Sequence, residues 1–175
     1  MNSGLRRIYW GIVFITFHIY LGTLPILPTF VGWLIILQGF NKLEIFLSKQ
    51  SLGMRIIGGI TVFLALIGDF STIFQFDLYI FQNIIIILPR IFEFVFFFYL
   101  FELFFEGHKK DVVYQRIYII ASSIFIIISC VFQIIPIDPS KMILVWVGGV
   151  AIRIMLMSYI SGKRKELENR LQLNY

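Results

Sequence analysis

Residues 84–105 read IIIILPRIFEFVFFFYLFELFF, an apolar run that is interrupted in its first half by Arg90 and Glu93. A helix needs about 20 apolar residues to cross the hydrocarbon core of a bilayer, so the length of this run predicts a transmembrane helix. Charged side chains are costly inside such a span, and each is by default a candidate functional residue. This segment therefore indicates both a fold class and a first candidate site.

The same pattern recurs along the chain. There are six apolar runs, at residues 8–23, 27–40, 56–74, 84–105, 117–137 and 142–161. Of the 175 residues, 59% are hydrophobic and 14% are charged, whereas a soluble domain is about 25% charged. We therefore predict an all-α integral membrane protein, a bundle of six transmembrane helices forming a single domain over residues 1–161. A short basic cytoplasmic tail follows at residues 162–175.

The second run is the weakest of the six. It is short if it stops at Asn41, but it becomes a full span if it continues through Leu43 and Phe46. A re-entrant segment is the alternative. Residues 41–55, which follow it, mix charges with Leu, Ile and Phe and are typical of an interfacial amphipathic stretch.

Basic residues predict the orientation of the bundle, because Lys and Arg are enriched in cytoplasmic loops. With the N-terminus in the cytoplasm, twelve of the fifteen fall inside and only Lys141 falls outside, since Arg90 and Arg153 lie within spans. The twelve are Arg6, Arg7, Lys42, Lys49, Arg55, Lys109, Lys110, Arg116, Lys163, Arg164, Lys165 and Arg170. We predict a multi-pass protein of the cytoplasmic membrane with both termini inside. The net charge of +5 therefore reflects topology and does not indicate nucleic-acid binding.

Four charged residues interrupt the predicted spans: Asp69, Arg90, Glu93 and Arg153. In the predicted topology Asp69 and Arg90 lie at the same depth in the bilayer. Glu93 and Arg153 lie at roughly one common depth, farther from the outer surface. One interpretation is a pair of salt bridges that hold the third, fourth and sixth spans together. Another is a polar cavity, open to the outside, that binds a polar solute or ion, and a third is a proton relay through Asp69 and Glu93.

Two local features modify this interpretation. Arg90 is near enough to the outer surface to extend its side chain outward and need no partner. Gly148 and Gly149 lie one turn before Arg153, where small residues allow another helix to approach closely.

Enzyme signatures are thin. Cys130 stands alone inside an apolar run, and no cysteine-based metal motif is present. His18 falls within the first span and His108 within a cytoplasmic loop, too far apart in depth for a shared metal site. We expect no catalytic activity, no cofactor and no metal.

One short motif resembles a known group. Leu27-Pro28-Thr29-Phe30-Val31-Gly32-Trp33 follows a Leu-Pro-x-apolar-apolar-Gly-aromatic pattern. Similar motifs occur early in small multi-span membrane proteins of Gram-positive bacteria, which are mostly uncharacterised. The resemblance covers roughly residues 11–40 and implies no particular activity.

Two functions fit these patterns. The first is a small transport-related membrane protein that binds a polar solute or ion at the four intramembrane charges. The alternative is a non-catalytic membrane partner, such as a regulator, immunity protein or assembly factor, that docks another protein through residues 41–55 and 162–175. A polar cavity around the charges favours the first function.

Overall fold

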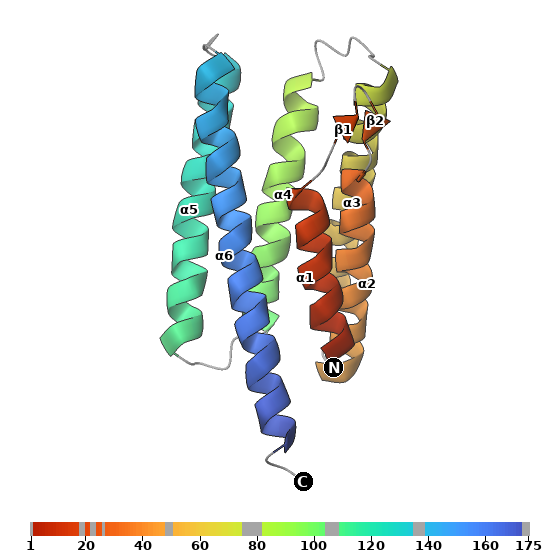
Figure 1. Cartoon of the computed structure of the whole chain (residues 1–175), viewed down its shortest axis with the longest axis vertical. Helices are drawn as coiled ribbons and strands as arrows, with labels where there is room; N and C mark the ends of the chain where they lie inside the picture. The colour runs from red at the N-terminus through yellow and green to blue at the C-terminus, as the bar shows by residue number, and fades with distance from the viewer. Residues whose placement is uncertain are drawn as a thin grey trace.

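The computed structural model describes residues 2–17, 20–21, 24–25, 27–47, 51–74, 82–103, 109–134 and 139–172. Six helices make up nearly all of this part of the chain (Figure 1). They are α1 (Asn2–Thr16), α2 (Thr29–Leu47), α3 (Leu52–Phe74), α4 (Gln82–Leu103), α5 (Lys109–Ile134) and α6 (Pro139–Gln172). Two strands of two residues each, β1 (Tyr20–Leu21) and β2 (Leu24–Pro25), pair antiparallel between α1 and α2.

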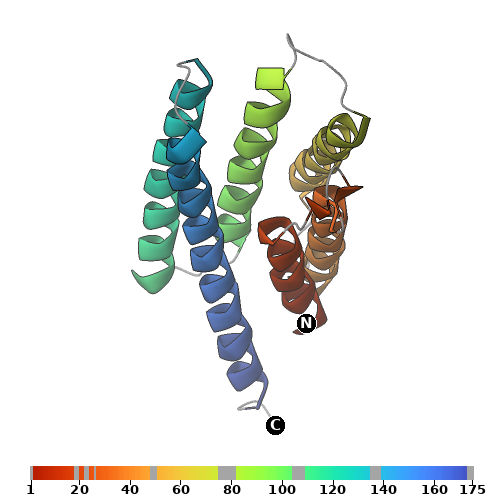
Figure 2. The same cartoon turned by 45° about the horizontal axis from the view of Figure 1, so that its top comes forward.

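The helices form a closed ring. Each helix packs against the next along the chain, and α6 packs against α1. Figures 1 and 2 show α5 and α6 on one side, α1, α2 and α3 on the other, and α4 between them. The start of α1 and the end of α6 lie at the same end of the bundle, where α6 extends beyond the other helices (Figure 1).

The six described helices correspond to the six predicted ones, but the first is displaced. We predicted a span over residues 8–23, whereas α1 starts at Asn2 and ends at Thr16. The Thr16 hydroxyl donates a hydrogen bond to the carbonyl of Ile12 at 2.6 Å, a side-chain contact that competes with continued helix. With 15 residues, α1 is about 22 Å long at the usual helical rise, less than the ~30 Å bilayer core.

Most of residues 41–55 belong to two helices. Within this range α2 continues through Leu47 and α3 begins at Leu52, and the interfacial position of the stretch stays a prediction. Glu44 is buried and accepts hydrogen bonds from the backbone N–H of Ser51 at 2.5 Å and from Nε of Arg55 at 2.6 Å. These contacts hold a tight helical hairpin. At the other end of the chain, α6 extends the last predicted span through Gln172.

Glycines bring α1 and α2 into unusually close contact. Gly4 on α1 faces Gly39 on α2, and Gly11 on α1 faces Gly32 on α2. The two glycines of each helix are seven residues apart in the sequence. A Cβ on Gly11 would lie 2.7 Å from the carbonyl oxygen of Gly32, and a Cβ on Gly39 would lie 2.7 Å from that of Gly4. The backbones therefore touch directly, as small residues permit at helix–helix contacts in membranes.

Aromatic side chains fill the interior of the ring. Trp33 of α2 packs against Phe96 and Phe97 of α4, with ring centroids 5.6 and 5.8 Å apart. Tyr118 of α5 continues the cluster by contacting Phe97, and its ring centroid lies 5.2 Å from that of Phe101. Trp33, Phe96, Phe97 and Tyr118 are all buried, so aromatic side chains of α4 contact those of α2 and α5 in the interior of the ring.

The outer surface, in contrast, is apolar. Two stretches among the described residues are long and apolar enough to cross a membrane, Leu52–Ser71 in α3 and Asp111–Val131 in α5. Only 28% of the first and 17% of the second are buried within the protein. Large apolar side chains such as Phe63, Ile120 and Ile127 are more than half exposed. The core helix of a soluble protein would bury such residues, so these two helices indicate association with a membrane.

Candidate functional site

Glu93 and Arg153 form the charged centre of the ring. Nε and Nη2 of Arg153 each donate a hydrogen bond to one carboxylate oxygen of Glu93, both at 3.0 Å. This two-pronged contact is the strong geometry for an arginine and a carboxylate. The described parts of α4 and α6 are not packed neighbours, so the two side chains bridge the ring. The sequence-based prediction that Glu93 and Arg153 pair is confirmed.

Arg153 also binds the end of α1. Its Nη1 donates a hydrogen bond to the carbonyl oxygen of Ile15 at 2.8 Å. The last four carbonyls of a helix lack an intrahelical donor, and together they carry a partial negative charge that favours a nearby cation. Arg153 therefore joins α6 to α4 through Glu93 and to α1 through Ile15. This contact explains how α1 can end inside the bundle.

Asp69 plays the corresponding part at the start of α2. Its side chain is buried and accepts a hydrogen bond from the backbone N–H of Phe30 at 3.1 Å. Since α2 begins at Thr29, this N–H lies in the first turn, where donors lack intrahelical acceptors and an anion is favourable. The cation Arg153 thus binds the end of α1, and the anion Asp69 binds the start of α2.

Arg90 makes its hydrogen bond to α5, although it lies close enough to Glu93 and Arg153 to interact with their charges. It donates a hydrogen bond to the hydroxyl of Ser129 on α5, and its guanidinium carbon lies 5.0 Å from the centroid of the Phe125 ring. The predicted match between Asp69 and Arg90 is therefore wrong, because each contacts a different helix. Equal depth is not sufficient for pairing, since the side chains must also lie on facing sides of their helices. Arg90 also has partners, contrary to the expectation that it needs none.

The structure shows two further clusters of charged side chains that were not singled out from the sequence. One is the Glu44–Arg55 pair described above. In the other, Nζ of Lys163 on α6 lies 2.7 Å from Asp111 of α5 and 3.1 Å from Glu166. Asp111 lies in the first turn of α5, a position that favours an acidic side chain. An acid at the start of a predicted helix is the sequence feature that could have indicated this cluster.

The pKa of Lys163 shows that its charge is stabilised. Burial alone would lower this pKa, but the hydrogen bonds that Lys163 donates to Asp111 and Glu166 outweigh burial and raise it above its usual value. A raised lysine pKa contributes stability that is fully present below the unfolded value of about 10.4 and is lost only as pH rises through the folded pKa. The bridge is therefore intact at neutral pH.

Two polar side chains of α2 differ in their contacts. Gln38 bonds across helices, because Nη1 of Arg7 donates to its side-chain oxygen at 2.9 Å. Asn41 does not, since its buried Oδ1 has no hydrogen-bond partner among the described residues. A Cβ on Gly149 would lie 3.0 Å from the Phe125 ring, which confirms the close approach of another helix there. His18 and His108 lie outside the described residues.

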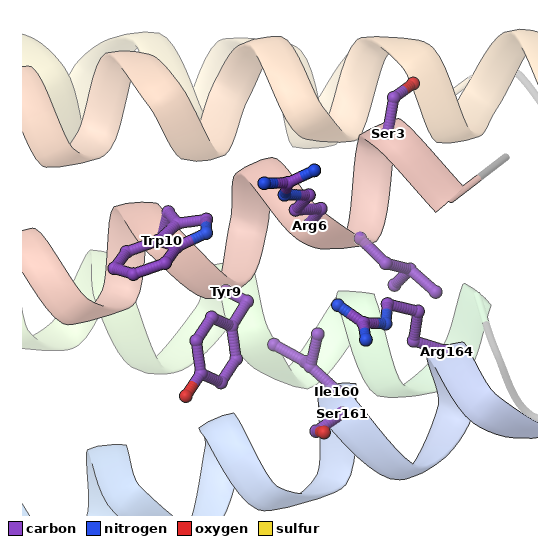
Figure 3. A pocket seen from close by; sticks show the side chains of 8 residues that line it. Ser3, Arg6, Tyr9, Trp10, Ile160, Ser161 and Arg164 are labelled. Carbon is purple, nitrogen blue, oxygen red and sulfur yellow. The ribbon is translucent and has the colours of Figure 1, made fainter.

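A pocket of about 670 Å³ lies between α1 and α6, away from the four predicted site residues. Figure 3 shows the side chains of Arg6 and Tyr9 from α1 and of Arg164 from α6 around it. Within the described part of the chain, no group of three or more His, Cys, Asp or Glu residues is placed to hold a metal ion.

Comparisons with protein-family models, curated proteins and solved structures find no match for this chain.

Proposed function

We propose that the chain is a six-span integral membrane protein with both termini in the cytoplasm. Three observations support this. The surfaces of α3 and α5 are apolar and exposed, the charged centre lies inside the ring, and the basic residues divide twelve to one across the predicted spans. The short α1 fits because its carbonyl end is bound by Arg153, and the bilayer tolerates a helix end only where protein satisfies it.

Cysteine labelling tests this orientation. In a Cys130→Ser background, we expect Asp77→Cys to react with a membrane-impermeant thiol reagent on intact cells and Lys109→Cys to react only after lysis. Labelling of the cysteine at position 109 from outside would contradict the six-span topology. A cysteine at Arg6 serves as a second inside position, because the N-terminus and the α4–α5 loop are predicted on the same side.

Within this frame, we propose that a small polar or charged solute binds at Glu93 and Arg153. One observation carries the proposal. The pair lies inside the ring, yet 22% of the Arg153 side chain and 17% of the Glu93 side chain remain accessible. Ionisable groups that face a bundle interior or a water-filled cavity commonly mark a substrate or ion pathway in a membrane protein. A solute anion would compete with Glu93 for the guanidinium fork, so the site favours a carboxylate-bearing or zwitterionic solute.

A ligand screen by thermal unfolding in detergent tests the proposal. A solute present at a hundred times its dissociation constant should stabilise the wild type by about 2.7 kcal/mol. We expect Glu93→Gln to remove the stabilisation by a zwitterionic solute, because its cationic group loses the Glu93 carboxylate. The same variant should strengthen the stabilisation by a purely anionic solute, which competes with Glu93 for Arg153. Glu102→Gln is the matched control: Glu102 lies on the same helix, and its side chain is exposed.

The alternative is a membrane partner without a solute, and the length of α6 favours it. This helix has 34 residues, about 51 Å at the usual rise, so it extends well past the bilayer core. Truncation after Glu166 removes the end of α6 but keeps the Lys163–Asp111 contact. If no solute shifts the wild-type melting temperature while this truncation abolishes function in cells, the partner role replaces the solute role.

A further inference from the structure

The pocket between α1 and α6 has a distinct chemical character. The lining combines two guanidinium groups, from Arg6 and Arg164, with the hydroxyl groups of Ser3 and Ser161, and none of its described residues is acidic. Arg6 is exposed. Figure 3 shows the Arg164 side chain extending from α6 toward α1, on which Arg6 lies. The planar fork of arginine matches phosphate oxygens, so two such groups in one pocket favour a phosphate-bearing anion.

The start of α1 adds to this preference. The helix begins at Asn2, and Ser3 lies in its first turn. The first-turn N–H groups of a helix carry a partial positive charge and are directed outward along its axis. The pocket therefore lies beside two arginine side chains and a positive helix end, and every one of these elements attracts an anion.

The other half of the lining is apolar and aromatic. Leu5, Tyr9, Trp10 and Ile160 complete the wall, and Trp10 is half exposed. The last predicted span ends at Ser161, and α1 starts at Asn2 at the same end of the bundle (Figure 1), so the pocket lies next to the proposed inner membrane boundary. Trp and Tyr are typical of this boundary, and basic pockets between helices on the cytoplasmic side bind acidic lipid headgroups.

We propose that the α1–α6 pocket binds a phosphate-bearing anion, supplied by the headgroup of an anionic phospholipid in the inner leaflet. The phosphate lies between Arg6 and Arg164, and the start of an acyl chain follows Trp10 and Ile160. The bound lipid then bridges the first and last helices of the ring near its cytoplasmic end. The assignment to the inner leaflet rests on the proposed orientation, whereas the phosphate site itself does not.

The test uses the full chain in neutral-detergent micelles, where the orientation has no influence. Short-chain phosphatidylglycerol is titrated against thermal unfolding, with short-chain phosphatidylcholine and inorganic phosphate as separate arms. We expect phosphatidylglycerol to raise the melting temperature and the other two to have little effect. The variant Arg6→Gln with Arg164→Gln should need at least tenfold more phosphatidylglycerol for the same shift.

The matched control is Lys42→Gln with Arg116→Gln, which removes two exposed basic side chains from the same predicted face. Equal loss in both double variants would overturn the proposal, because binding would then depend only on overall surface charge. An equal response to inorganic phosphate would replace the lipid by a free phosphate ligand. If the arginine variant does not fold, Ser161→Phe fills the pocket without changing its charge, and wild-type lipid affinity in that variant overturns the proposal.

Discussion

Arg153→Leu is expected to lower the free energy of unfolding by up to about 3–5 kcal/mol, the effect of removing one partner from a fully buried ion pair, because the Glu93–Arg153 pair is mostly buried. The substitution leaves Glu93 without the guanidinium that contacts both of its oxygens. It also removes the donor that binds the carbonyl of Ile15 at the end of α1. Thermal or denaturant unfolding in detergent measures the loss.

The double variant Glu93→Leu with Arg153→Leu should recover much of this stability, because it leaves no unpaired charge in the ring. Recovery should be incomplete, since the carbonyl of Ile15 still lacks the Arg153 donor. Arg116→Leu is the control: Arg116 is exposed, and removing an exposed charge should have little effect. Losses that simply add in the double variant would show that the two residues are not coupled.

Gly11→Ala should destabilise the protein by about 1–3 kcal/mol, the typical effect of inserting atoms into a well-packed contact. The new Cβ would lie 2.5 Å from Cγ1 of Ile36 and 2.7 Å from the carbonyl oxygen of Gly32. The carbonyl belongs to the backbone of α2, so α1 and α2 must separate to accommodate the methyl group. The midpoint of unfolding in a denaturing detergent reports the change.

Gly59→Ala provides the matched control for this substitution. Gly59 lies within α3, and a Cβ there meets nothing within 4 Å. The control should be neutral or stabilising by up to about 1 kcal/mol, because alanine favours helix over glycine. Equal effects at positions 11 and 59 would mean that the backbone contact between α1 and α2 contributes nothing to stability.

The candidate site was only partly predictable. Glu93 and Arg153 were matched from depth alone, because helix rise converts sequence position directly into depth. The same argument was wrong for Asp69 and Arg90, whose partners are the backbone N–H of Phe30 and the hydroxyl of Ser129. Depth is one coordinate, whereas the direction of a side chain also depends on how its helix is rotated against its neighbours.

Sequence alone determined the number of helices and their approximate positions, because the length of an apolar run is a property of neighbouring residues. Tertiary structure decided where α1 ends, since the carbonyl of Ile15 near its end is bound by Arg153 from the last helix of the chain. It also decided the close packing of α1 on α2, although the seven-residue spacing of Gly4 and Gly11, and of Gly32 and Gly39, is visible in the sequence. Helix ends and helix contacts depend on backbone groups that are chemically identical in every residue, so only the fold shows which of them meet.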